Sequence, residues 1–183
     1  MPEIQSVMMQ SAHTQNMETV YLLLGGNIDD REKIINSAIS LLNSKAGTVE
    51  QVSSLYETEP WGMSNAKSFL NIAVKMTTEL YAFQFLDIIL KIEEQLGRTR
   101  NPLTTEYESR PIDIDILFWG SKIIQTDQLT IPHPHLQIRK FVLVPLCEIA
   151  AEFIHPVFQK TIITLLNECP DNLEIVALKP YIL

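Results

Sequence analysis

The chain has 183 residues, of which 46% are hydrophobic and 20% charged, and its 14 Lys and Arg against 22 Asp and Glu give a formal net charge of −8. These values favour one folded domain and exclude a largely disordered chain or a highly charged coiled coil. The acidic balance argues against a nucleic-acid partner, and no apolar run reaches the ~20 residues of a membrane span.

The N-terminal segment lacks Lys and Arg and has no apolar core, so it is unlike a targeting signal. It also shows no helical or strand periodicity, and we expect a disordered tail over residues 1–18 and a single domain over residues 19–183. Cys147 and Cys169 lie 22 positions apart with no metal-ligand spacing, which is typical of free thiols. The sequence therefore predicts a cytoplasmic protein.

The first half of the expected domain alternates strand and helix signals. A β-rich run at Thr19–Leu24 stops at two glycines, and a helical apolar spacing then extends from an N-cap at Asp30 to Gly47. Val49–Thr58 is predicted as one second strand, and Phe69–Thr77 as a third with two alternating faces. This half therefore has the order strand, helix, strand, strand.

The second half continues with a helix, a strand and a short hairpin strand. A helix is predicted over Ala82–Leu96, and Ile112–Phe118 reads as a strand with its isoleucines and Phe118 on one face. A turn at Gly120–Ser121 is expected to pair that strand with a short one at Lys122–Gln125. The whole order, β-α-β-β-α-β, predicts an α+β ferredoxin-like sandwich with an added hairpin.

Two further helices are indicated beyond the sandwich. One lies around Phe141–Ala150, where Pro145 weakens the helical signal, and a better one lies around Lys160–Cys169. They predict a C-terminal helical extension.

Asp113 and Asp115 are the sharpest chemical signal. Two residues apart on a strand, they project from one face with Cβ atoms roughly 7 Å apart. At an effective dielectric constant of 20, such charges repel by roughly 2 kcal/mol. Bound Mg²⁺ would turn that repulsion into attraction, whereas a solvated strand face is the simpler interpretation.

Four arginines surround this strand in the sequence: Arg98, Arg100, Arg110 and Arg139. Ion pairs with the aspartates are the usual explanation for such a face, but four arginines beside two carboxylates leave an excess of positive charge that suits phosphate oxygens. The polar loop between Arg100 and Arg110 is either a phosphate-closing lid or an ordinary surface connection.

A proline-stiffened segment carries His133 and His135 at strand-like spacing. Zinc is disfavoured because a third and fourth ligand would have to come from His13 and His155. A histidine contact to phosphate, or a hydrogen bond within the loop, remains as an interpretation.

Several segments together resemble the 6-hydroxymethyl-7,8-dihydropterin pyrophosphokinase family. The resemblance runs from about Thr19 to Ala151. It depends on Tyr21–Asn27, Ser53–Thr58, Phe69–Asn71, Ile92–Glu93, Gly97–Arg100, Arg110–Leu117 and Ile131–His133. The chain differs from the usual pattern at Gly26, Tyr107, Gln128 and Pro134.

The resemblance implies transfer of pyrophosphate from ATP to a pterin hydroxymethyl group, with release of AMP. It implies that Asp113 and Asp115 hold two Mg²⁺ ions and act in catalysis with Arg98 and Arg110. The ATP-binding set would be Glu93, Arg98, Arg100, Arg110, Thr130, His133 and Arg139. The pterin-binding set would be Thr58, Trp61, Phe69, Asn71 and Phe141, with Arg100 and Tyr107 in a lid. Small molecules would be the only partners, and the protein would be a monomer.

Two other classes of protein share parts of this pattern. A nucleotide-sugar transferase also uses two aspartates for its metal, but the chain lacks a nucleotide-binding α/β domain. A non-catalytic ferredoxin-like module that binds a small molecule would bind ATP without turnover, and its four arginines need not converge.

Overall fold

The computed structural model describes residues 17–59, 67–99 and 109–181. In chain order the elements are β1 (Glu18–Gly26), α1 (Arg31–Lys45), β2 (Thr48–Val52), β3 (Leu55–Thr58), β4 (Phe69–Thr78), α2 (Ala82–Gln95), β5 (Asp113–Trp119), β6 (Ile124–Gln125), β7 (Thr130–Ile131), a 3₁₀ turn (Leu136–Ile138), α3 (Lys140–Ala150), α4 (Ile162–Asn167) and β8 (Ile175–Lys179). The predicted ferredoxin-like α+β fold with a C-terminal extension is confirmed.

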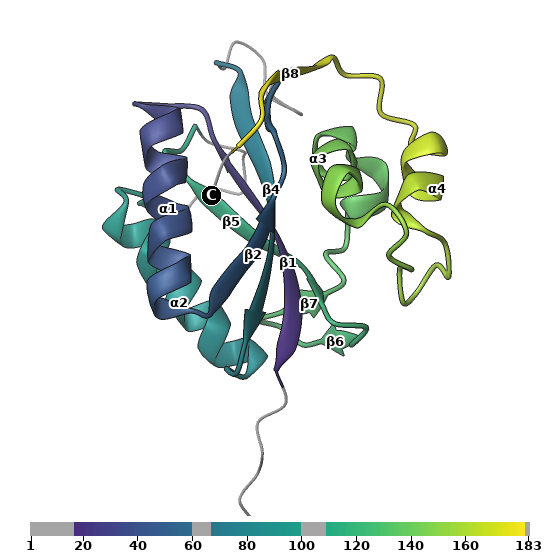
Figure 1. Cartoon of the computed structure of the whole chain (residues 1–183), viewed down its shortest axis with the longest axis horizontal. Coiled ribbons are helices and arrows are strands. Elements are labelled where there is room, and N and C mark those ends of the chain that lie inside the picture. The colour runs from purple at the N-terminus through teal and green to yellow at the C-terminus, as the bar shows by residue number, and fades with distance from the viewer. Residues whose placement is uncertain (1–16, 60–66, 100–108, 182–183) are drawn as a thin grey trace, which may run out of the picture.

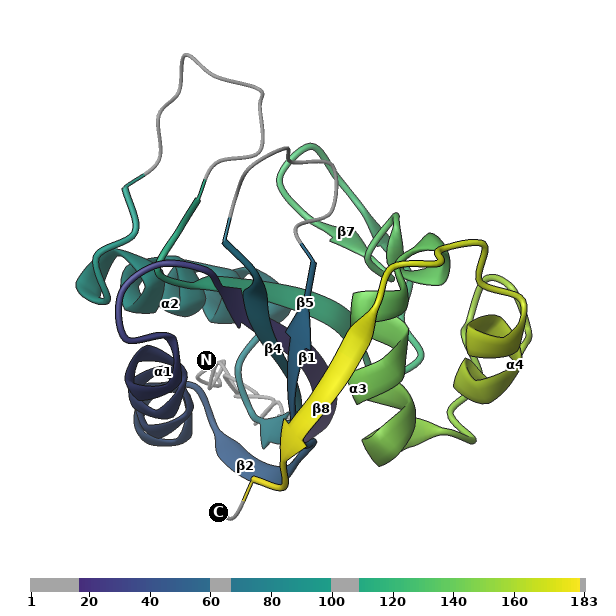
Figure 2. The same cartoon turned by 90° about the horizontal axis from the view of Figure 1, so that it is seen from above.

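One antiparallel sheet forms the centre of the molecule. Its strands follow the order β5-β1-β4-β3-β8, and β2 pairs with the far part of β4. Helices α1 and α2 cover one face, α3 lies against the other, and α4 packs on the outer side of α3 (Figures 1 and 2). None of the helices in the described ranges is long and apolar enough to cross a membrane.

The sheet is buried on both faces because successive strand residues point to opposite sides. Leu22 and Leu24 of β1 pack in the cluster beneath α1 and α2, together with Phe85. Leu23 packs in the opposite cluster with Leu143 of α3. This explains why β1 is a nearly continuous apolar run rather than an alternating one.

The single strand predicted at Val49–Thr58 is wrong, because the chain forms two strands there. Ser53 separates them: its backbone N–H donates to Ala73 O at 2.9 Å, and its Oγ accepts from Ala73 N at 2.9 Å. A side-chain oxygen thus replaces the backbone acceptor of a regular ladder. The break lets β2 and β3 pair with different parts of β4.

The predicted face of Phe118 is also wrong. Tyr21 pairs with Phe118 and Leu22 with Ile116, which leaves Leu117 as an extra residue in β5. A bulge of this kind reverses the alternation beyond it. Phe118 therefore packs against Tyr21, on the face away from Ile116.

The expected hairpin exists with a different partner. β6 pairs with β7 in a separate two-stranded sheet rather than with β5 across Gly120–Ser121. The N-terminal boundary also differs, since Glu18, expected in the tail, begins β1 opposite Thr78. The extension contains an unpredicted strand, β8, which pairs with β3.

Candidate active site

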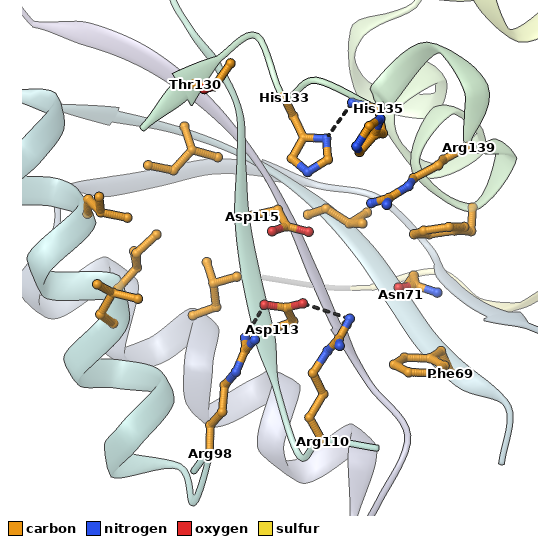
Figure 3. A pocket seen from close by; sticks show the side chains of 18 of the residues that line it. Phe69, Asn71, Arg98, Arg110, Asp113, Asp115, Thr130, His133, His135 and Arg139 are labelled. Atoms are coloured by element: carbon orange, nitrogen blue, oxygen red, sulfur yellow. Dashed lines mark hydrogen bonds and ion pairs between the residues drawn. The ribbon is translucent and has the colours of Figure 1, made fainter. Parts of the chain in front are cut away.

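A cavity of about 580 Å³ lies where β1, β4 and β5 meet the start of α3 and the segment after β7 (Figure 3). Most of the predicted site residues line it together: Thr58, Phe69, Asn71, Arg98, Arg110, Asp113, Asp115, Thr130, His133, Arg139 and Phe141. Trp61, Arg100 and Tyr107 lie outside the described residues. Residues from distant parts of the chain thus converge as the resemblance implied.

Strand register places the central side chains in rows. Gly25 of β1 pairs with Asp113 on one side and with Asn71 on the other. The neighbouring row joins Asp115 to Leu23. A Cβ atom at Gly25 would lie 2.5 Å from Asn71 Oδ1, so the glycine leaves room for the amide beside the carboxylates.

The two aspartates differ sharply in their surroundings. Asp113 contacts Arg98, and its Oδ2 lies 2.9 Å from the Arg110 guanidinium. Burial opposes its ionisation, but the charges of Arg110 and Arg98 outweigh burial and hold the pKa of Asp113 below its usual value. For Asp115, burial and then the charge of Asp113 raise the pKa to about 7.

Glu93 lies behind Arg98 and is not among the residues that line this cavity. The residue is 1% exposed, and its Oε1 accepts from Arg98 at 2.7 Å and from Ile114 N at 2.8 Å. Glu93 therefore fixes both the arginine and the start of the aspartate strand.

Asn27, which lies at the end of the Tyr21–Asn27 motif and was not predicted as a site residue, fixes the backbone of Arg110. Its side-chain Oδ1 accepts from the backbone N–H of Arg110 at 2.8 Å, and the backbone N–H of Asn27 donates to Arg110 O at 3.0 Å. Nearby, a Cβ atom at Gly26 would lie 2.1 Å from Pro111 O. The glycine that departs from the usual pattern thus permits close contact between β1 and the segment before β5. In the sequence, the signal for this role is an asparagine that directly follows two glycines at the end of a strand.

The uncharged side of the cavity holds two aromatic rings and an amide. Asn71 is 3% exposed and donates from Nδ2 to Thr58 Oγ1 at 2.8 Å. The guanidinium of Arg110 lies 5.5 Å from the centre of the Phe69 ring, and that of Arg139 lies 5.8 Å from the centre of the Phe141 ring. Cations thus contact both rings in this structure.

Arg31 was not predicted as part of the site, yet it binds the residues next to Thr58 and Phe69 from outside the cavity. One guanidinium nitrogen lies 2.9 Å from Glu57 Oε1, 2.8 Å from Ser68 O and 3.1 Å from Ser68 Oγ. Thr58 of β3 pairs with Phe69 of β4, and Glu57 and Ser68 are the residues directly before them in the chain. The hydrogen bonds from Ser68 and Arg31 hold the pKa of Glu57 below its usual value. Only the fold brings these three residues together.

His133 is a neutral side chain at the edge of the charged region. Burial and then the charge of Arg139 lower its pKa to about 4. Its Nδ1 accepts from His135 N at 3.3 Å, which assigns the ring proton to Nε2. Figure 3 shows His133 facing Asp115 across the cavity. Within the described ranges, no group of three His, Cys, Asp or Glu could form a metal site alone.

Comparison with known proteins gives a consistent result. The family model described as 7,8-dihydro-6-hydroxymethylpterin-pyrophosphokinase (HPPK) matches residues 21–151. The 2-amino-4-hydroxy-6-hydroxymethyldihydropteridine pyrophosphokinase of Bacillus subtilis is 44% identical over 133 residues, covering 72% of this chain and 78% of that protein. The Aquifex aeolicus protein of the same name is 40% identical over 144 residues, covering 79% and 88%.

Among solved structures, a triple mutant of Plasmodium falciparum HPPK-DHPS superposes with a TM-score of 0.71 at 19% identity. The match covers 86% of this chain and 44% of that one, so the chain spans less than half the length of this structural relative. At this identity the likeness concerns the fold.

Proposed function

Because the chain belongs to the 7,8-dihydro-6-hydroxymethylpterin-pyrophosphokinase family, we propose that it transfers pyrophosphate from ATP to the hydroxymethyl group of 6-hydroxymethyl-7,8-dihydropterin, releasing AMP, in folate synthesis. One observation carries the proposal: a single cavity joins an aromatic and amide region to a carboxylate pair flanked by arginines. Its volume of about 580 Å³ is in the range of small-molecule sites.

The uncharged region suits the pterin. Phe69 and Phe141 offer ring faces for stacking, and Asn71 with Thr58 offers polar atoms to the edge of the heterocycle. Trp61 completes this set in the proposal. In the proposal, a pterin takes the place of the two cations that now contact the rings, and these cations turn toward phosphate.

The charged region suits the triphosphate. Arg98, Arg110 and Arg139 converge on it, and the neutral His133 can donate from Nε2 to a phosphate oxygen. Thr130 lies at the same edge, and Glu93 acts on ATP through Arg98. Arg100 and Tyr107 close over the nucleotide as a lid in this proposal.

The aspartates have the chemistry of a magnesium site. The raised pKa of Asp115 reflects a carboxylate whose charge is poorly compensated beside Asp113. Two carboxylates supply part of an oxygen shell, and Mg²⁺ takes its remaining ligands from phosphate and water. Asp113 and Asp115 would hold two Mg²⁺ ions, which neutralise charge on the triphosphate. Arg98 and Arg110, which pair with Asp113 here, then contact phosphate oxygens.

The reaction is an in-line displacement. The pterin hydroxyl oxygen forms a bond to the β-phosphorus of ATP and loses its proton to solvent, and the bond from that phosphorus to the oxygen shared with the α-phosphate breaks, so that AMP leaves. Such transfers depend mainly on positioning and on electrostatic stabilisation. Arg98 and Arg110 supply positive charge where negative charge develops. The proposed enzyme acts as a cytoplasmic monomer on small molecules, with neither nucleic acid nor membrane as a partner.

Product analysis tests the proposal. Purified protein with ATP, Mg²⁺ and the hydroxymethyl pterin is expected to release AMP in proportion to the pterin pyrophosphate formed. Release of ADP, or turnover that ignores the pterin, would contradict the reaction. Mg²⁺-dependent ATP binding without any turnover would favour a non-catalytic binding module instead.

A further inference from the structure

Two cavity residues emerge from the first turn of α3. Arg139 is the N-cap residue and Phe141 lies one position inside the helix, with Lys140 between them. The Arg139 backbone is extended, with φ −121° and ψ 104°, and its side chain makes no capping hydrogen bond. Val142 N and Leu143 N donate to Arg139 O, whereas the N–H of Lys140, at the first position of the helix, needs an acceptor from elsewhere.

Asp171 supplies that acceptor from the C-terminal extension. Its Oδ2 accepts from Lys140 N at 2.9 Å, and its Oδ1 accepts from Leu173 N at 3.0 Å. One oxygen thus holds the helix end, while the other shapes the turn that carries the carboxylate. The negative charge also lies at the positive end of the helix dipole.

The extension reaches the opposite wall of the cavity as well. The segment that follows α4 crosses the first turn of α3 and continues into β8 (Figure 2). Ile175 of β8 pairs with Thr58 of β3, only four positions after Asp171. Residues beyond the family match at 21–151 are therefore in contact with both sides of the pterin region.

We propose that Asp171 is a positioning residue for the pterin, acting through the first turn of α3. Its carboxylate fixes the backbone between Arg139 and Phe141, and so sets the distance of the Phe141 ring from the facing wall. The inference rests on the proposed function, because it takes Phe141 to stack on the substrate. A residue with a purely structural role would lower stability without changing affinity.

The test measures equilibrium binding of the pterin and of ATP, together with kcat and KM, for Asp171→Ala and Asp171→Asn in the full chain. Asn keeps one acceptor oxygen, so it tests rescue of the cap. Thr161→Ala is a matched control, because Thr161 caps α4 through Thr164 N at 3.3 Å. Glu174→Ala removes an exposed carboxylate from the same segment.

Asp171→Ala is expected to weaken pterin binding about fivefold, the factor that the loss of one helix cap represents. Asp171→Asn restores most of the affinity, and both control variants bind pterin as the unaltered protein does. In a Phe141→Ala background, Asp171→Ala causes no further loss, because coupled residues are not additive.

Either of two results would overturn the inference: Asp171→Ala binding pterin as tightly as Thr161→Ala, or the same fivefold loss in the Phe141→Ala background. Failure of the proposed function looks different. In that case the unaltered protein itself produces no pterin-dependent AMP.

Discussion

The two regions of the cavity are held in place by different means. In the charged region the side chains hold one another, since Arg98 and Arg110 pair with Asp113 and Glu93 pairs with Arg98. In the uncharged region the backbone next to the rings is fixed by residues outside the cavity: Arg31 binds Ser68 beside Phe69, and Asp171 binds Lys140 beside Phe141. We therefore expect changes in the first region to affect kcat, and changes behind the second to affect pterin affinity.

The largest expected effect comes from Asp115→Asn. The substitution keeps the shape of the side chain but removes the charge that we assign to Mg²⁺, and kcat is expected to fall about a thousandfold or more. Steady-state kinetics with ATP and pterin measures the loss, and circular dichroism checks the fold. Asp127→Asn, an exposed change between β6 and β7, is the control and is expected to leave kcat unaltered. Substantial activity in Asp115→Asn would contradict the metal role.

Glu93→Gln tests how the charged region is held. The amide still accepts from Ile114 N but no longer pairs its charge with Arg98, and kcat is expected to fall about tenfold while pterin binding stays constant. Glu94→Gln changes the exposed neighbour as a matched control. A loss confined to pterin affinity would show that the two regions are not separable in this way.

Arg31→Met tests the brace of the uncharged region. The substitution removes three contacts to Glu57 and Ser68, and pterin affinity is expected to fall about threefold to fivefold with ATP affinity unchanged. Titration of each ligand separately measures the difference. Lys33→Met removes an exposed cation from the same helix and serves as the control. An equal loss for both ligands would indicate general destabilisation instead.

The smallest effect on activity is expected from substitution of His155, which lies outside both regions and affects stability instead. It is 2% exposed, and burial lowers the pKa of its ring to about 4. The unfolded chain binds this proton more readily, so the contribution to stability is complete above about pH 6.5 and is lost as the pH falls toward 4. The loss is about 3 kcal/mol for this side chain.

Unfolding by urea at pH 7 and pH 4.5 measures this dependence on pH. His155→Gln is expected to reduce it, whereas the exposed His135→Gln leaves it intact. If the unaltered protein, His155→Gln and His135→Gln lost equal stability between pH 7 and pH 4.5, the pH dependence could not be assigned to His155.

Local patterns in the sequence predicted much of the fold, because helix and strand periods depend on neighbouring residues. The helix from Asp30 toward Gly47 is confirmed, with Asp30 accepting from Lys33 N as its cap. The aspartate strand is confirmed with a start one residue later, at Asp113. The convergence of Asp113, Asp115 and the arginines was expected from the family resemblance, since spacing alone favoured a solvated strand face and left ordinary ion pairs open.

What only the tertiary structure decided depends on pairing across long distances in the chain. The bulge at Leu117 and the break at Ser53 arise from register against neighbouring strands, which no local period encodes. The partners of Arg31 and the capping role of Asp171 likewise join segments at least 26 residues apart. The sequence by itself determined which side chains are chemically able to act in a site, because charge and aromaticity belong to single residues. Folding decided which of them pair with one another and which are positioned by residues outside the cavity, because a hydrogen bond needs two groups brought within about 3 Å.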